Sequence, residues 1–304
     1  MRDFSLAFFP NMESWSHEEQ SNAVRFGTVP KPLDAGPCLR PGRKFSPDGT
    51  IGSIISALWT RLPPIEMGVP SDLENLVLQA QLTTLPVVGA ESRFPARRIY
   101  CVGRNYVEHI REMKEADERD PPFFFQKPTD SVVPDGGVVP YPPLTKELHH
   151  EVELVVAVGR GGRNIPPGTA LDHVFGYAIG LDMTRRDLQR EAKKRGLPWE
   201  IGKAFDHSAP CGAIHTVAST GHFAEGAITL EVNGSIKQKG DLREMIWNVP
   251  EILSNLSSQY ELRPGDLILT GTPSGVGPVV PGDRLEGKID RLGSLHITIG
   301  PPEA

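Results

Sequence analysis

Apolar and polar residues follow two different patterns along this chain. In residues 1–93, prolines and glycines are scattered among polar residues, and a sustained apolar run appears only at IGSIISALW. This pattern is typical of irregular chain, so we expect an N-terminal extension that is partly disordered. In residues 94–304, short apolar runs alternate with turn signals, which predicts one compact domain.

Met67 is a candidate start of translation. It opens the stretch MGVPSDLENLVLQAQLTTLPVV, which directly precedes the compact region. Our hypothesis is that the natural protein begins at this methionine and that residues 1–66 are not made. Peptides from upstream of Met67, in a mass spectrum of protein from the native host, would refute this hypothesis.

Apolar runs bounded by turn residues predict the strands of the compact region. The predicted strands are IYCVG, EVELVVAVG, VFGYAIGLDM, DLILTG, RLEGKI and LHITI, and ITLEVNGSIKQ is predicted to be a hairpin that turns at Asn233-Gly234. Asn105 is expected to cap a helix NYVEHIREMKEA, Thr184 to start a polar helix that ends near Gly196, and VPEILSNLSSQY is a third helix. The fold class is therefore α+β, with a mostly β core and a few short helices.

One predicted strand, HHEVELVVAVG at residues 149–159, is apolar on both faces yet carries two glutamates. Side chains alternate along a strand, so Glu151 and Glu153 share a face with Val155 and Ala157. A buried carboxylate is costly unless a cation or hydrogen bonds compensate its charge. Two carboxylates on one face therefore need a shared partner.

Composition narrows the choice of partner. The net charge is -6, from 38 acidic and 32 basic residues, and no basic block suggests nucleic acid or an anionic membrane. No stretch approaches the roughly 18 apolar residues of a spanning helix, and the N-terminus lacks the features of a signal peptide. Cys38, Cys101 and Cys211 form no C-x-x-C motif, which fits a reducing compartment. We expect a cytoplasmic protein that binds small molecules.

A divalent metal ion is the partner that the residue types favour. Carboxylates at i and i+2 of one strand can converge on one ion, and Asp182, at the end of the buried run GYAIGLD, can supply a third ligand. Three carboxylates suit Mg²⁺, Mn²⁺ or Ca²⁺ better than zinc or copper. An E-x-E pattern taken alone more often marks a solvated face or an ion pair. The apolar opposite face and Asp182 favour the metal.

His109 and Glu112 lie three residues apart on the first predicted helix and therefore share one of its faces. A carboxylate that orients an imidazole is the usual construction of a general base that deprotonates water. The alternative is an exposed ion pair in a charge-rich helix end, and the spacing alone favours that alternative.

Other polar residues are candidates for binding a substrate. Arg186 and Gln189 share a helix face and can bind a carboxylate, although most such pairs are merely exposed. Lys127 and Lys203 lie among apolar residues, where an ammonium needs an anion or must reach water. The glycine-rich turn LTGTPSGVG can present N–H groups and the Thr272 hydroxyl to an anion, but many such turns are only turns.

Six stretches in this order resemble the fumarylacetoacetate hydrolase family: CVGRNYVEHIREM, FFFQKP, HHEVELVVAVG, GLDMTRRDLQ, LPWEIGKAFD and LTGTPSGVG. The resemblance covers residue 94 to the C-terminus and implies a mixed-sheet β roll, usually a homodimer. It also implies Mg²⁺ or Mn²⁺ bound by the three carboxylates, a base at His109 oriented by Glu112, and a lysine at Lys203. The positions that it implies contact substrate are Arg186, Gln189 and Thr272. Residues 1–93 do not resemble the N-terminal domain of the longer members.

The resemblance implies hydrolysis of a carbon–carbon bond in a 2,4-dioxo acid. The stretches FPARRIYCVGRNY and WEIGKAFDHSAPCGAI are most similar to the branch of this family that converts 3-fumarylpyruvate to fumarate and pyruvate in gentisate breakdown. Acylpyruvate hydrolysis or oxaloacetate decarboxylation are alternatives within the family. A more distant alternative is a non-catalytic, metal-stabilised dimer or small-acid binder, in which the carboxylates are structural. The pair of His109 and Glu112 argues against it, since a binder needs no base.

Overall fold

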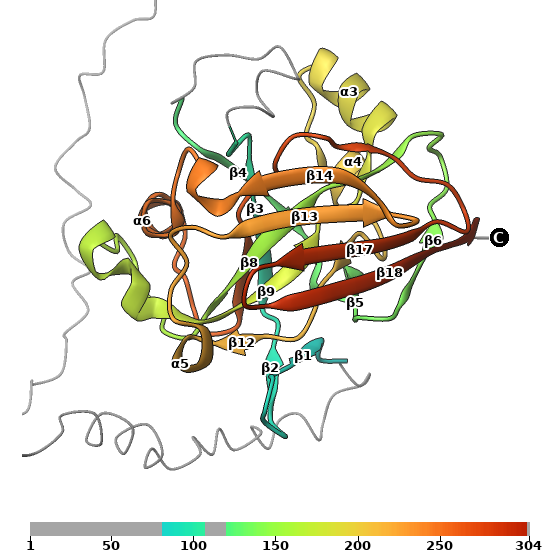
Figure 1. Cartoon of the computed structure of the whole chain (residues 1–304). Helices are drawn as coiled ribbons and strands as arrows, with labels where there is room; N and C mark the ends of the chain where they lie inside the picture. The colour runs from blue at the N-terminus through green and yellow to red at the C-terminus, as the bar shows by residue number, and fades with distance from the viewer. Residues whose placement is uncertain (1–80, 107–119, 303–304) are drawn as a thin grey trace, which may run out of the picture. The chain divides into compact units, whose positions relative to one another are not determined.

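The structure, a computed structural model, describes residues 81–106 and 120–302. Two mixed β-sheets dominate this part of the chain (Figure 1). In the six-stranded sheet, of order β12-β9-β8-β15-β3-β4, β15 runs parallel to β3 and the other pairs are antiparallel. In the five-stranded sheet, of order β14-β13-β17-β18-β6, β18 and β6 are parallel. The predicted mostly β fold with few short helices is confirmed.

The bounds of the elements are as follows. The six-stranded sheet comprises β3 (Arg98–Gly103), β4 (Phe123–Lys127), β8 (Val152–Val158), β9 (Val174–Leu181), β12 (His215–Thr216) and β15 (Asp266–Leu269). The five-stranded sheet comprises β6 (Val138–Tyr141), β13 (Ala227–Val232), β14 (Ser235–Asp241), β17 (Arg284–Ile289) and β18 (Gly293–Pro302). The smaller sheets comprise β1 (Thr84–Pro86) with β2 (Arg93–Pro95), β5 (Val132–Val133) with β11 (Ala209–Pro210), and β7 (Leu148–His150) between β10 (Thr184–Arg185) and β16 (Gly277–Pro278). The helices are α3 (Arg186–Lys194), α4 (Glu200–Lys203), α5 (Val217–Thr220) and α6 (Val249–Gln259), with 3-10 turns at Thr129–Ser131, Pro167–His173 and Leu242–Glu244.

Strand β8 is buried on both faces, as its sequence predicts. Val152, Leu154, Val156 and Val158 join the larger apolar core, which also contains residues from the five-stranded sheet. On the opposite face, Val155 and Ala157 pack in a second core. The alternation that separates these two sets also places the glutamates of this strand.

The second core extends to residues before the expected domain boundary at 94. Leu85 of β1 and Phe94 of β2 are buried in it, together with Val87. The hairpin of β1 and β2 belongs to the folded unit because its apolar residues cover one face of the six-stranded sheet. Residues 1–80, including Met67, lie outside the described residues, so the expectations for that segment stay predictions.

The predicted cap Thr184 has another role, and Asn105 makes contacts outside the helix that it is predicted to cap. Helix α3 begins at Arg186 and not at Thr184, because Thr184 lies in β10 and its hydroxyl donates to Glu151 Oε1 at 3.1 Å. Asn105 donates to the Thr270 carbonyl at 2.7 Å and accepts from the Trp247 N–H, which links β3 to two distant loops. The helix predicted after Asn105 lies largely outside the described residues.

The other local predictions are confirmed. Asn233 and Gly234 form the hairpin turn between β13 and β14, with φ of 51° and 77°. Helix α6 has Asn248 as its cap in a capping box with Glu251. Among the described residues, no helix is long and apolar enough to cross a membrane.

Candidate active site

Three carboxylates meet where β8 lies beside β9. Glu153 lies on β8, Glu151 directly precedes this strand, and Asp182 directly follows β9. The antiparallel pairing of Val152 with Leu181 holds the two ends together, and the Asp182 N–H donates to the Glu151 carbonyl at 2.9 Å. The three side chains are buried, and each offers a carboxylate oxygen within 4.8 Å of the other two. The predicted triad therefore converges in space.

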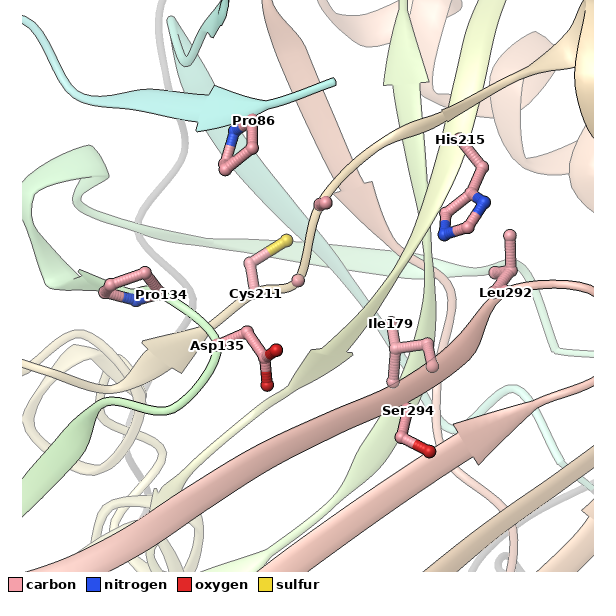
Figure 2. Close-up of a pocket in the computed structure, with 10 residues that line it drawn as sticks. Pro86, Pro134, Asp135, Ile179, Cys211, His215, Leu292 and Ser294 are labelled. Atoms are coloured by element: carbon pink, nitrogen blue, oxygen red, sulfur yellow. The ribbon is translucent and has the colours of Figure 1, made fainter. Parts of the chain in front are cut away.

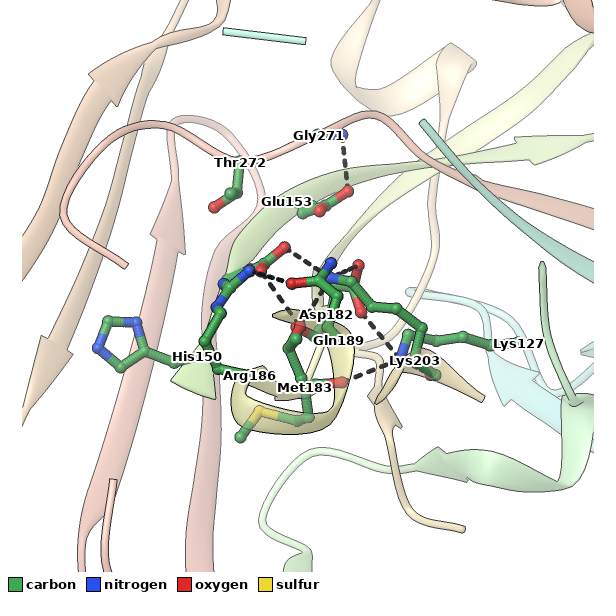
Figure 3. A network of polar contacts seen from close by, with 12 residues as sticks. Lys127, His150, Glu153, Asp182, Met183, Arg186, Gln189, Lys203, Gly271 and Thr272 are labelled. Atoms are coloured by element: carbon green, nitrogen blue, oxygen red, sulfur yellow. Dashed lines mark hydrogen bonds and ion pairs between the residues drawn. The ribbon is translucent and has the colours of Figure 1, made fainter. Parts of the chain in front are cut away.

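Three cations surround these carboxylates (Figure 3). Lys203 Nζ lies 3.0 Å from Glu151 Oε2 and 2.7 Å from Asp182 Oδ2, and Lys127 Nζ lies 2.8 Å from Asp182 Oδ1. The Arg186 guanidinium pairs with Glu151 Oε1. All three cations are buried, so the ion pairs are poorly screened by water. Lys127 and Lys203, which the sequence places among apolar residues, thus find the anions that they need.

The closeness of these buried charged side chains shifts the pKa values of Glu153 and Lys203. Burial raises the pKa of Glu153 well above its ordinary value, and the charges of Asp182 and Glu151 raise it further. The Gly271 N–H, which donates to Glu153 Oε2 at 2.6 Å, and Lys203 offset only part of this effect. For Lys203, burial lowers the pKa, but the two neighbouring carboxylates outweigh burial and the net pKa is raised. Lys203 is therefore an ammonium at neutral pH.

A divalent cation fits this arrangement. The donors are three carboxylates, which are the ligands that Mg²⁺ and Mn²⁺ prefer. Burial and the neighbouring carboxylates Asp182 and Glu151 disfavour the negative charge of Glu153. A cation bound between the three carboxylates removes that repulsion. Glu151, Glu153 and Asp182 are accordingly the residues that could hold the metal.

Buried hydrogen bonds fix the backbone around the carboxylates. The Thr272 hydroxyl donates to the Val152 carbonyl at 2.8 Å. Gln238 of β14 donates to the Thr272 hydroxyl at 2.7 Å, and its Oε1 accepts from the Val152 N–H at 3.0 Å. The same oxygen lies 3.0 Å from His150 Nδ1. This network joins the glycine-rich turn to the strand that carries Glu153.

Two of these residues were missed by sequence reasoning. Gln238 is the buried position of a strand that is otherwise largely exposed, and nothing in its local sequence separates it from a surface glutamine. The sequence predicts that Thr184 starts a helix, whereas its hydroxyl accepts from Lys203 Nζ at 2.6 Å. A sequence signal exists for Thr184 only in its position two residues after Asp182.

The remaining candidates fall into two groups. Arg186 and Gln189 are both buried and joined by a 2.6 Å hydrogen bond, so the structure brings this predicted pair together next to Glu151. His109 and Glu112 lie outside the described residues, and their pairing stays a prediction.

A separate hollow of about 240 Å³ is lined by Asp135, Ile179, Cys211, His215 and other residues (Figure 2). Burial raises the pKa of the Cys211 thiol to about 12, so this thiol stays protonated at neutral pH. A protonated, buried thiol is a poor nucleophile. The charged groups suited to binding a small acid collect instead at the carboxylate cluster.

Comparisons with known proteins find relatives of this chain. Residues 98–300 match the family described as "Fumarylacetoacetate (FAA) hydrolase C-terminal". The fumarylpyruvate hydrolase of a Ralstonia species is 46% identical over 182 residues, which cover 60% of this chain and 94% of that protein. The mitochondrial oxaloacetate tautomerase FAHD1 of Homo sapiens is 42% identical over 207 residues, which cover 68% of this chain and 93% of the relative.

A solved structure shares the architecture. The crystal structure of fumarylpyruvate hydrolase from Pseudomonas aeruginosa, in complex with Mn²⁺ and pyruvate, superposes with a TM-score of 0.73. The two chains are 50% identical, and the match covers 75% of this chain and 100% of the other. The predicted type of β roll is therefore confirmed.

Proposed function

The chain belongs to the fumarylacetoacetate hydrolase family, and we propose that it hydrolyses 3-fumarylpyruvate to fumarate and pyruvate with Mg²⁺ or Mn²⁺. The observation that carries the proposal is the buried cluster of three carboxylates within 4.8 Å of one another, beside the cations Lys127, Lys203 and Arg186. A relative of 50% identity that holds Mn²⁺ and pyruvate supports the choice of metal and product. The proposal places the reaction in cytoplasmic gentisate breakdown.

The charges of the site support an anionic substrate. Among the described residues, the three carboxylates and the three cations carry equal and opposite formal charges. A divalent cation would add two positive charges to these six side chains, in a buried region where charge is poorly screened. A 2,4-dioxo acid brings one carboxylate next to a 2-oxo group, and its cleavage develops a second negative charge on that group. Substrate and site are thus complementary in charge.

The reaction itself adds water across a carbon–carbon bond. The water oxygen bonds to C4 of the dioxo acid and loses a proton, and the bond between C3 and C4 then breaks. C4 becomes the new carboxylate of fumarate, while the electron pair remains with the pyruvate fragment as an enolate, which takes up a proton at C3. When bound, a divalent cation supplies a Lewis acid that stabilises this enolate.

The side chains of the site supply the metal ligands, the acid and the base of this proposed reaction. Glu151, Glu153 and Asp182 hold the cation. Lys203 stays protonated beside Asp182, so it stabilises the negative charge on the reacting oxygen and can supply the proton that the enolate takes up. His109, oriented by Glu112, removes the proton from the attacking water.

Substrate binding falls to residues next to the carboxylates. Arg186 and Gln189, already joined by a hydrogen bond, present donors to the substrate carboxylate. The Thr272 hydroxyl, which Gln238 holds in place, is the third member of this proposed set.

Oxaloacetate tautomerisation is a second candidate, because relatives with that activity are 42% identical over 68% of this chain. Tautomerisation moves a proton between carbon and oxygen and needs no attack by water. Oxaloacetate decarboxylation and acylpyruvate hydrolysis use the same enolate.

A substrate panel separates these activities. Purified protein with Mg²⁺, Mn²⁺ or a chelator is given 3-fumarylpyruvate, acetylpyruvate or oxaloacetate, and the products are quantified. We expect the highest kcat/KM with 3-fumarylpyruvate, and loss of turnover with the chelator. Faster turnover of oxaloacetate, with 3-fumarylpyruvate inert, would refute the proposed substrate.

A further inference from the structure

A row of aromatic rings leads away from the carboxylate cluster along β4. Side chains alternate along a strand, so Phe123, Phe125 and Lys127 share one face. Lys127 marks where that face points, because its Nζ forms the ion pair with Asp182. The Phe125 ring lies next in the row, with its centroid 5.2 Å from Lys203 Nζ. Phe123 follows roughly 7 Å further along the strand.

Trp199 joins the two phenylalanines into one wall. It directly precedes α4, the short helix that carries Lys203. Its ring packs edge-on against Phe123, with centroids 5.0 Å apart, and lies 6.1 Å from Phe125. All three rings are only half-buried, so the wall is accessible although it adjoins a buried polar site.

The far end of the wall carries positive charge. The Arg104 guanidinium lies 5.5 Å from the centroid of Phe123.

The backbone holds this end in a defined shape. Arg104 has a φ of 59°, in the left-handed region that side chains other than glycine rarely adopt. The preceding Gly103 pairs with Phe123, and a Cβ at Gly103 would lie only 2.0 Å from the Phe123 ring. The Phe123 ring therefore occupies the space beside Gly103 that a side chain would fill. The backbone of Arg104 turns so that its guanidinium lies over the same ring.

We propose that this wall binds the distal arm of the substrate, with its conjugated chain along Phe125, Trp199 and Phe123 and its terminal carboxylate at Arg104. The inference rests on the proposed function and deepens it, because it assigns the residues that distinguish a fumaryl group from a shorter one. Aromatic faces suit a planar, unsaturated chain, and a guanidinium suits a carboxylate. The trans double bond of a fumaryl group holds its carboxylate away from the reacting carbons, towards Arg104. A cis isomer turns its carboxylate back from that end.

The test compares two substrates that differ in the distal arm. Acetylpyruvate has the same dioxo acid as 3-fumarylpyruvate but no distal carboxylate. In Arg104→Gln we expect kcat/KM for 3-fumarylpyruvate to fall about 10- to 100-fold, mainly through KM, and that for acetylpyruvate to stay within about twofold. Arg104→Lys keeps the charge and should recover part of the loss. Arg190→Gln removes an exposed arginine that pairs with Glu147, and should leave both substrates unchanged.

A binding measurement keeps the inference separate from the proposed function. Calorimetry with Mn²⁺-loaded protein gives dissociation constants for fumarate and for pyruvate without any turnover. We expect fumarate to bind about 10-fold or more weakly to Arg104→Gln, and pyruvate to bind as it does to the wild type. Equal effects on both acids, or none on fumarate, would overturn the assignment of the wall. If wild-type protein binds fumarate through Arg104 but leaves 3-fumarylpyruvate intact, the proposed function fails and the wall stands.

Discussion

Replacing Glu153 by glutamine separates metal binding from the packing of the site. The substitution keeps the size of the side chain and leaves an oxygen to accept from the Gly271 N–H, which lies 2.6 Å away in the wild type. It removes one of the three negative charges that the cluster offers to a cation. In the metal-free protein, burial and the charges of Asp182 and Glu151 already raise the pKa of Glu153, so a neutral side chain relieves repulsion. The stability of the metal-free protein should therefore be kept or increased, whereas its affinity for the metal should fall.

The magnitudes follow from linkage. Wild-type protein in Mn²⁺ at about 100 times its Kd gains about 2.7 kcal/mol of stability. For a folded unit of 150–250 residues this corresponds to a rise in Tm of roughly 5–10 °C. We expect Glu153→Gln to lose nearly all of this rise, and to melt no lower than wild type when both are metal-free.

Differential scanning calorimetry with and without Mn²⁺ measures both quantities. The matched control is Glu286→Gln, because Glu286 is a partly exposed glutamate of β17 that pairs with Lys288. This variant should keep the full rise in Tm with Mn²⁺. A wild-type-sized rise in Glu153→Gln would refute the account of the cluster, as would a metal-free Tm well below that of wild type.

Three further outcomes test other parts of the site. Lys203→Met should lower kcat about 100-fold or more while calorimetry still detects Mn²⁺ binding, because the carboxylates remain. Gln238→Leu should lower Tm by roughly 5–10 °C in thermal melts, because the buried Val152 N–H loses its acceptor and Thr272 its donor. Burial raises the pKa of Asp187, but hydrogen bonds from the Lys146 N–H and the Thr145 hydroxyl outweigh burial, and the net pKa is lowered. Wild type should therefore be more stable than Asp187→Asn above pH 3.8, and this advantage should shrink as the pH falls below 3.8. Urea titrations at a series of pH values measure the difference.

The strands and the carboxylates were predictable because their signals are local. The alternation in VELVVAV predicts a strand buried on both faces, and the two cores on either side of β8 confirm it. Glu151, Glu153 and Asp182 could be grouped because one strand carries or adjoins two of them and the next buried strand ends at the third.

The residues that sequence reasoning missed depend on distant contacts. Gln238 is the one buried position of β14, and its side chain contacts Thr272, which lies 34 residues later in the sequence. The local sequence around Thr184 is typical of a helix start. In the structure, β10 pairs with β7, and the Thr184 hydroxyl accepts a hydrogen bond from Lys203. Arg104 carries no local signal, because its contact with Phe123 is set by the pairing of β3 with β4.

The most direct test of the central claim is product analysis. Purified full-length protein is mixed with 3-fumarylpyruvate in Mn²⁺ or in a chelator, and the products are followed by proton NMR. The account predicts fumarate and pyruvate in equal amounts with Mn²⁺, and unchanged substrate with the chelator. Unchanged substrate in Mn²⁺, or equally fast cleavage in the chelator, would contradict it.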